Sequence, residues 1–400
     1  MPLLRPAGAR RVELGILLLQ AVVGVAPGHR PGVSPPAFDA VTFDPIVESG
    51  VRRGAYPGAA LVIGRRDTIL FAKGYGHLTW SRASPAVDPE STLYDLASVT
   101  KVIATTTSVM ILLDRGRVTL EAPLATYLPE LAGTGTGAVT VQQLLAHTSG
   151  LRADIPDAEL KALRDSAALM RRVFAETPRV PSGTRVIYSD LNAILLGEVV
   201  RHAAGEPLDR FAAREVFTPL GLRQTMFRPP ARLTRRIAPT GVWRGHPVAG
   251  LVNDGSAFKL RGVSGNAGLF STARDVARFA QFMLRSGAGP DGRALVRPET
   301  VRRFTTRTAD FGHGTEARAL GWQALPTGEQ VSSAGTLFGP RSYGHTGWTG
   351  TSLWVDPDRD LFVVLLTNRA FTPRARRPFT ILHEVRGRIA DGAAQASDAR

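Results

Sequence analysis

Apolar residues recur along this chain in two rhythms, one near its ends and one in its middle. Near the ends they form short uninterrupted runs bounded by turn residues, which is the pattern of buried strands. These runs occupy residues 59–64, 69–74, 352–355 and 361–367. In the middle they repeat every three or four positions, which is the pattern of amphipathic helices. The predicted helices occupy residues 139–147, 190–204, 206–217, 272–284 and, near the end, 378–390.

The order of these elements predicts an α+β fold. The simplest arrangement is one antiparallel sheet, flanked by helices and built from both chain ends, with an all-helical lobe inserted at about residues 115–285. Residues 98–115 are apolar on almost every side, so they are expected to form a buried central helix. The weakly periodic residues 223–268 are expected to form a long loop. We expect one main domain over residues 43–390 and a short tail over residues 391–400.

The N-terminus has the pattern of an export signal. Arginines precede an apolar run at residues 14–26, so residues 1–26 are expected to be a signal peptide of a periplasmic or secreted protein. The alternatives are an uncleaved membrane anchor and a wrongly assigned start codon. The Pro- and Gly-rich residues 27–42 then form a linker. No later stretch holds 18 apolar residues in a row, so no further membrane span is expected.

The composition narrows the class of protein. The 44% share of hydrophobic residues is that of a globular chain. The net charge is +15, but the basic residues are scattered without a long run, so nucleic-acid binding is not expected. The chain has no cysteine, which excludes disulfides and thiol nucleophiles. Its eight histidines form no metal-binding pair, so neither a metal nor a cofactor is expected.

A serine and a lysine lie one helical turn apart at the start of the predicted central helix. In Ser98-Val99-Thr100-Lys101, positions i and i+3 share one helix face, so the hydroxyl and the amine can touch. A serine becomes a good nucleophile when a neighbour takes its proton. Lys101 can act as that base, or it can stay charged and assist another base. The alternative is that Ser98 only caps the helix and Lys101 lies at the surface.

Two further triplets follow in order, Tyr188-Ser189-Asp190 and His345-Thr346-Gly347. With the serine–lysine pair, they make the chain resemble the class C β-lactamase and penicillin-binding protein superfamily of serine hydrolases over about residues 40–390. Three flanking segments agree with this resemblance, at residues 94–97, 144–151 and 268–272. The resemblance implies a β-lactamase/transpeptidase-like fold.

The resemblance also implies a role for each motif residue. Ser98 would attack a carbonyl and form an acyl-enzyme, while Lys101 and Tyr188 would share the proton transfer. A tyrosine phenol ionises near pH 10, so Tyr188 needs a nearby cation to act as a phenolate. The oxyanion hole would be the backbone N–H groups of Ser98 and Trp348. The remaining motif residues would contact the substrate: Asp190, His345, Thr346 and Gly347.

The chain departs from the lactamase pattern at two positions. It has His345 where lactamases have lysine, and Asp190 where they have asparagine. Both changes weaken recognition of a substrate carboxylate, because a permanent cation is lost and an anion is gained. Asp190 is expected either to contact Lys101 or to bind an amine in the substrate.

Polar residues outside the three triplets are expected to be structural. His147 lies where a predicted helix ends in a turn, so it is not expected to be catalytic. Asn253 and Asp254, in the predicted long loop, either line the cleft or form a turn.

The sequence therefore predicts a secreted serine hydrolase, expected to be a monomer. Its substrate would be a small molecule or a peptide, such as a cell-wall peptide. Three candidate substrates remain: a peptidoglycan D-Ala peptide, a D-amino-acid amide and a carboxylic ester. A weak β-lactamase activity is the last of the expected activities. The alternative from another class is a non-catalytic, penicillin-binding-like protein that binds wall peptides or a partner.

Overall fold

A six-stranded antiparallel sheet forms the centre of the structured chain. The computed structural model describes residues 37–309, 317–326 and 332–399, so the predicted signal peptide lies outside the described residues. The strand order is β2-β1-β11-β10-β9-β8. The strands are β1 (Gly58–Gly64), β2 (Ile69–Gly76), β8 (Gln323–Ala324), β9 (Tyr343–Thr346), β10 (Ser352–Asp356) and β11 (Leu361–Thr367).

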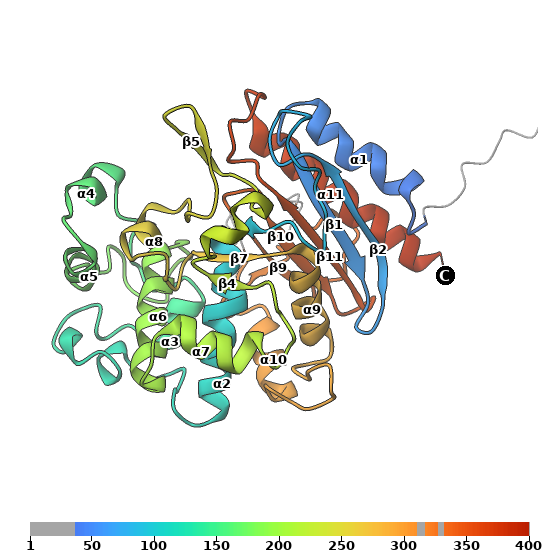
Figure 1. Ribbon diagram of the computed structural model, residues 1–400. Coiled ribbons are helices and arrows are strands. Elements are labelled where there is room, and N and C mark those ends of the chain that lie inside the picture. The colour runs from blue at the N-terminus through green and yellow to red at the C-terminus, as the bar shows by residue number, and fades with distance from the viewer. Residues whose placement is uncertain (1–36, 310–316, 327–331, 400) are drawn as a thin grey trace, which may run out of the picture. The chain divides into compact units, whose positions relative to one another are not determined.

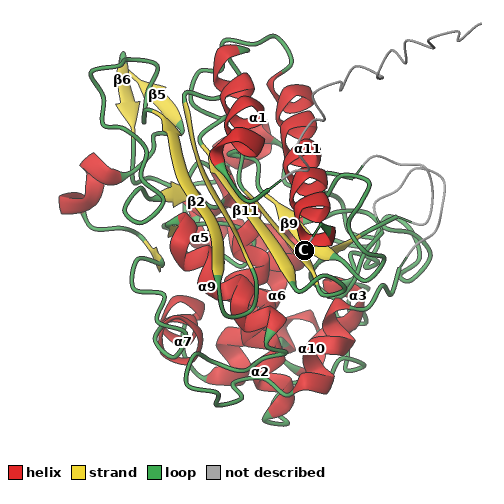
Figure 2. Ribbon diagram, turned by 90° about the vertical axis from the view of Figure 1, so that its right-hand side faces the viewer, coloured by secondary structure: helices red, strands yellow, loops and turns green. Residues whose placement is uncertain are grey.

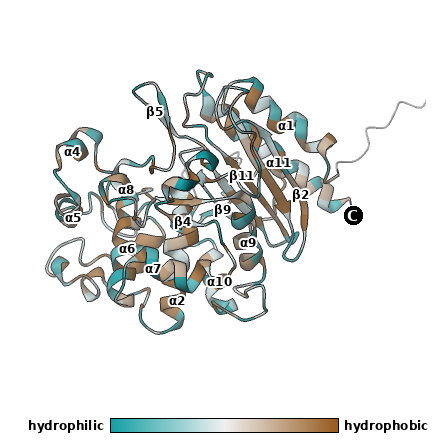
Figure 3. Ribbon diagram, viewed as in Figure 1, coloured by the Kyte–Doolittle hydropathy of each residue, from teal (hydrophilic) through white to brown (hydrophobic). Residues whose placement is uncertain are grey.

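The sheet joins the two ends of the chain, as the sequence predicts. Strand β1 pairs with β11 along its whole length, and every residue of both strands is buried. Alternate side chains of a strand point to opposite faces, so Leu61 and Ile63 enter one apolar core while Ala60 and Val62 enter the other. Both faces are covered, which explains why these strands are continuously apolar and appear brown in Figure 3.

Two helices from opposite chain ends cover one face of the sheet, α1 (Ala40–Arg52) and α11 (Pro378–Asp398) (Figures 1 and 2). Helix α1 begins inside the segment expected to be a linker, because Asp39 caps it by accepting a hydrogen bond from the Thr42 N–H. Helix α11 continues through most of the segment expected to be a tail. Small buried residues such as Ala393 and Ala394 let this extension pack closely against the core.

The other face of the sheet carries α9 and, beyond it, the helical lobe (Figure 1). Helix α9 (Ala273–Leu284), expected within the lobe, instead packs directly on β1, β10 and β11. The remaining α-helices are α2 (Thr107–Asp114), α3 (Val141–Leu145), α4 (Asp157–Ala162), α5 (Ser166–Phe174), α6 (Asp190–Ala204), α7 (Leu208–Ala212), α8 (Gly255–Lys259) and α10 (Pro298–Thr305).

The predicted central helix is present but changes its winding along its length. It starts as a 3₁₀ turn at Ala97–Val99, continues as a π-helix at Lys101–Thr106 and ends as α2. In the described part of the chain, Ala97–Asp114 is the one helical stretch long and apolar enough to cross a membrane, and most of it is buried inside the protein. That burial is what a core helix of a globular domain shows.

The expected long loop at residues 223–268 contains short elements. Strands β3 (Tyr94–Asp95), β7 (Leu269–Ser271) and β4 (Met226–Phe227) form a small sheet in that order, so part of this segment supports the chain that leads into Ser98. Strands β5 (Gly241–Trp243) and β6 (His246–Val248) form a separate exposed hairpin.

Candidate active site

Ser98 lies at the start of the central helix, just after β3, on a strained turn. The preceding residue, Ala97, has a φ of 47°, in the left-handed region that non-glycine residues rarely adopt. The buried carboxylate of Asp95 holds this turn by accepting hydrogen bonds from the backbone N–H of Ala97 at 2.9 Å and of Asn253 at 2.7 Å. Strain maintained by surrounding contacts is a common feature of functional sites.

The turn after β9 is hydrogen-bonded to the residues that directly precede Ser98. The Thr349 hydroxyl donates to the Asp95 carbonyl at 2.6 Å, and the Thr351 hydroxyl donates to the Leu96 carbonyl at 2.8 Å. A Cβ atom on Gly347 would lie 2.2 Å from Thr351 Oγ1 and 2.5 Å from the Leu96 carbonyl oxygen. The third motif therefore needs glycine at this position, because the two backbone segments approach so closely.

Lys101 contacts Ser98 from inside the protein. Its Nζ donates to Ser98 Oγ at 3.0 Å and to the Asn266 carbonyl at 2.9 Å, and it forms an ion pair with Asp190 at 2.6 Å. Burial disfavours the ammonium ion, but the negative charges of Asp190 and Tyr188 outweigh burial and hold the pKa of Lys101 above its ordinary value. Lys101 is thus a buried cation at neutral pH and not a surface residue.

Tyr188, directly before α6, lies between two cations and two imidazole rings. Its ring centroid is 5.1 Å from Lys101 Nζ and 4.8 Å from Cζ of the buried Arg318. The ring of His147 lies 4.7 Å away, and that of His345 lies 6.0 Å away. The first two motifs and part of the third are therefore brought together around one phenol.

His345 is enclosed and does not occupy the substrate-facing position expected from the sequence. Its side chain is 1% exposed, and Nδ1 lies 2.8 Å from the Thr346 carbonyl oxygen. Burial, followed by the nearby charges of Arg318 and Lys101, holds the pKa of His345 well below its ordinary value. The imidazole is therefore neutral at pH 7. Thr346, the next residue, is partly exposed.

His147 has the structural position expected of it. It follows α3 with a φ of 56°, and its Nδ1 accepts a hydrogen bond from the Ser189 N–H at 3.1 Å. Burial, Arg318 and Lys101 hold its pKa well below the ordinary value, so this ring is neutral as well. Its contact with Ser189 fixes the chain next to Tyr188.

Trp348 follows the third motif and is 62% exposed. Its carbonyl accepts a hydrogen bond from Arg369 Nε at 3.0 Å, and the Arg369 guanidinium stacks on its ring with Cζ 5.0 Å from the centroid. The Phe379 ring packs against it at 4.9 Å. This arrangement fixes Trp348 at the surface next to the Ser98 segment, and the oxyanion role of its N–H stays a prediction.

Two carboxylates lie near Lys101: Asp154, which sequence reasoning missed, and Asp254, which was expected either to line the cleft or to form a turn. Burial, followed by repulsion from Asp190, raises the pKa of Asp154 to about 6, and the same two causes raise the pKa of Asp254. Asp254 also caps α8 by accepting a hydrogen bond from the Ala257 N–H at 2.7 Å. No sequence spacing relates these residues to Asp190, because each comes from a different segment of the lobe.

Arg318 is a further site residue that sequence reasoning did not identify. It lies between β8 and residue 309, where its backbone pairs with both. Nothing distinguishes it in the sequence from the other arginines, since only the folded chain places it against Tyr188.

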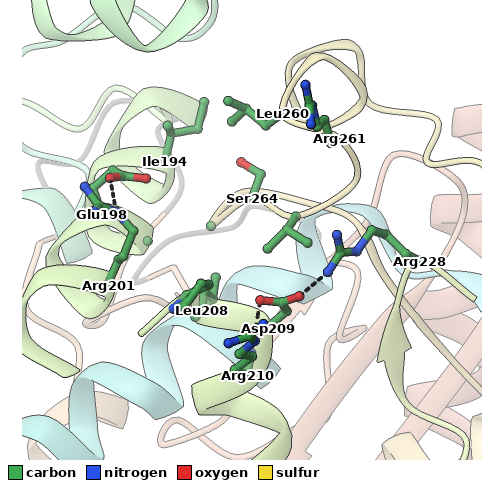
Figure 4. A pocket seen from close by; sticks show the side chains of 14 residues that line it. Ile194, Glu198, Arg201, Leu208, Asp209, Arg210, Arg228, Leu260, Arg261 and Ser264 are labelled. Carbon is green, nitrogen blue, oxygen red and sulfur yellow. Dashed lines mark hydrogen bonds and ion pairs between the residues drawn. The ribbon is translucent and has the colours of Figure 1, made fainter. Parts of the chain in front are cut away.

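A separate pocket of about 410 Å³ lies between α6, α7 and residues 260–265 (Figure 4). Its walls carry several charged side chains, including an Arg228–Asp209 ion pair. None of Ser98, Lys101 and Tyr188 lines it. Across residues 37–309, 317–326 and 332–399, no group of three or more His, Asp or Glu side chains could hold a metal ion.

Known proteins resemble this chain in sequence and in fold. The model of the Beta-lactamase family matches residues 43–385. A protein of Escherichia coli strain K12, named as a putative D-alanyl-D-alanine carboxypeptidase, is 33% identical over 356 residues, which is 80% of each chain.

Two solved structures share the fold. EstCE1, described as a hydrolase with promiscuous acyltransferase activity, aligns with a TM-score of 0.71 at 20% identity, over 89% of this chain and 98% of its own. A class C β-lactamase of Rhodobacter sphaeroides aligns with a TM-score of 0.67 at 22% identity, over 88% of this chain and 98% of its own. These likenesses confirm the predicted fold class. With the family match over most of its length, the chain belongs to the Beta-lactamase family and is a serine hydrolase of that family.

Proposed function

We propose that the protein hydrolyses an amide or an ester through an acyl-enzyme formed on Ser98. The observation that carries this proposal is the contact of 3.0 Å between Lys101 Nζ and Ser98 Oγ. The same lysine also contacts Asp190, the Asn266 carbonyl and Tyr188. The contact supports a nucleophilic serine, because such a serine needs a positioned proton-transfer partner.

The charge of Lys101 favours Tyr188 as the base. A lysine held as an ammonium by Asp190 has no lone pair with which to accept the serine proton. Tyr188, as a phenolate next to that ammonium, would take the proton while Ser98 Oγ bonds to the carbonyl carbon. The phenol would then return the proton to the leaving nitrogen or oxygen as the scissile bond breaks. A water molecule would hydrolyse the acyl-enzyme by the same steps in reverse.

The substrate class follows from the environment of the third motif. His345 is buried and neutral, so a substrate carboxylate would meet no cation from that residue. This favours a carboxylic ester, a D-amino-acid amide or a D-Ala peptide whose recognition depends little on its carboxylate, and it places β-lactams last. The E. coli relative is named as a putative D-alanyl-D-alanine carboxypeptidase, which supports a D-Ala peptide as the substrate.

The first test is hydrolysis of a panel of p-nitrophenyl esters, D-Ala peptides, D-amino-acid amides and nitrocefin. Ser98→Ala is expected to lower kcat by at least roughly a thousandfold, because the nucleophile is lost. Ser81→Ala changes an exposed loop serine and should leave kcat unchanged. Mass spectrometry after treatment with a serine-directed phosphonate should show one adduct on the wild type and none on Ser98→Ala.

Turnover in Ser98→Ala within tenfold of the wild type would overturn the mechanism. Absence of both turnover and adduct in the wild type would favour the alternative of a non-catalytic wall-binding protein.

We also propose that the protein is exported and acts as a monomer in the periplasm or outside the cell. The arginines and the apolar run within residues 1–26 support export. N-terminal sequencing of protein recovered from the periplasm tests cleavage, and light scattering tests the monomer.

A further inference from the structure

Arg318 is a buried cation that no sequence motif accounts for. Its side chain is 1% exposed, and its Cζ lies 4.8 Å from the centroid of the Tyr188 ring. Its backbone is fixed by two hydrogen bonds to Ala309, one in each direction, at 2.8 and 3.0 Å. Backbone hydrogen bonds thus fix the residue from which the guanidinium reaches Tyr188.

The groups around Tyr188 contribute two positive charges from two different elements. Lys101 approaches from the central helix with Nζ 5.1 Å from the ring centroid, and Arg318 approaches from the segment before β8. His147 and His345 complete the surroundings, and both are neutral at pH 7. Asp190 adds an anion, which is paired with Lys101.

Arg318 keeps its charge at neutral pH despite its burial. Burial lowers the pKa of Arg318 to about 10, and Tyr188 opposes this decrease. A phenolate on Tyr188 would attract the guanidinium next to its ring, so the arginine and the ionised tyrosine stabilise each other.

The position of Arg318 matters because of the histidine in the third motif. A lysine at position 345 would be charged at neutral pH, whereas the imidazole of His345 is uncharged at that pH. Arg318 provides a permanent cation next to the Tyr188 ring from a different part of the chain.

We propose that Arg318 is a positioning residue that, together with Lys101, stabilises the negative charge of Tyr188 during proton transfer from Ser98. This inference rests on the proposed function, since it assumes that Tyr188 accepts the proton.

The test is the pH profile of kcat/KM for a neutral p-nitrophenyl ester. Arg318→Met and Arg318→Gln remove the charge, so a higher pH is needed to keep Tyr188 ionised. The midpoint of the acidic limb should shift to a higher pH, by roughly one unit or more, and kcat/KM at pH 7 should fall about tenfold. Arg318→Lys retains a cation and should stay within about threefold of the wild type.

Arg236→Met is the matched control. Arg236 is partly buried and donates hydrogen bonds to the Ser91 carbonyl and to Gln224, but it lies in another part of the structure. Its loss should change the thermal midpoint without moving the pH profile. Should Arg318→Met fail to fold, Arg318→Gln keeps a planar polar head without the charge and gives the same test.

The outcomes separate this inference from the proposed function. An active wild type whose pH profile is the same in Arg318→Gln or Arg318→Met overturns the role of Arg318 alone. Equal losses in Arg318→Lys and Arg318→Gln, without a shift of the acidic limb, also overturn it, because the residue is then only structural. A wild type with no turnover and no phosphonate adduct overturns the proposed function first.

Discussion

Among single residues, His345 shows most clearly how burial changes chemistry. An exposed imidazole titrates near pH 6.5, but this ring is 1% exposed and lies near the charges of Arg318 and Lys101. The folded protein therefore keeps it neutral, whereas the unfolded chain protonates it as the pH falls. The neutral imidazole therefore makes its full contribution to the free energy of unfolding above pH 6.5, and this contribution is lost as the pH falls below that value.

His345→Gln should remove this dependence on pH. Relative to the wild type, the free energy of unfolding of the variant should rise by up to about 1.4 kcal/mol for each pH unit between roughly pH 6 and pH 5. Urea unfolding of both proteins at several pH values measures the difference. His246→Gln, at an exposed position in β6, is the control for the loss of a histidine as such. A constant difference for His345→Gln would mean that the ring protonates in the folded state.

Among the elements, the contact between α6 and the loop at residues 263–268 sets the geometry around Lys101. Gly197 of α6 faces Gly265 of the loop, and a Cβ atom on Gly265 would lie 1.9 Å from the Ala193 carbonyl oxygen. The Gly265 carbonyl accepts a hydrogen bond from the Thr105 hydroxyl at 2.7 Å. The next carbonyl, that of Asn266, accepts a hydrogen bond from Lys101, so the two glycines allow the loop to reach Lys101.

Gly265→Ala should push this loop away from α6. We expect a loss of about 1–3 kcal/mol in stability, as in other overpacked sites, and a fall in kcat of roughly tenfold because the Lys101 contact moves. Gly241→Ala is the control, since a Cβ at this position of β5 meets nothing within 4 Å. The thermal midpoint and kcat measure the two effects. Wild-type kcat in a destabilised Gly265→Ala would show that the loop does not position Lys101.

At the scale of the whole molecule, the sheet is closed from both chain ends. Helix α11 covers the face that carries Leu61 and Ile63, and its own buried residues include Val385 and Ile389. The last structural element is therefore as necessary to the core as the first strand, although it is far from the active site in sequence.

A chain that ends at Arg377 lacks α11 and should not fold. It would expose the apolar side chains of that face to water, at a cost of roughly 25 cal/mol per Å². Circular dichroism and urea unfolding measure the result. Glu384→Gln is the control, because it removes only exposed ion pairs, those with Arg53 and Arg388, and should cost less than about 1 kcal/mol. A cooperative transition at the wild-type midpoint in the shortened chain would contradict the role of α11.

The sequence by itself determined strands β1, β2, β10 and β11, helices α2, α3, α6, α7, α9 and α11, and the identities of the motif residues. It could do so because local periodicity shows which side of an element is apolar, and because the spacing of Ser98 and Lys101 on one helix brings them together. Helix α1 was not predicted and the length of α11 was underestimated, since Pro-containing and Ala-rich segments give a weak periodic signal. The short helices α4, α5, α8 and α10 were not predicted either.

Only the tertiary structure decided the electrostatics of the site and the place of α9. The enclosure of His345, the pairing of Asp190 with Lys101 and the contact of Arg318 with Tyr188 each join segments that are distant in the sequence. The charge state of a side chain depends on its burial and on its neighbours. A linear pattern specifies neither, because both arise only when the sheet and the helical lobe pack around Ser98.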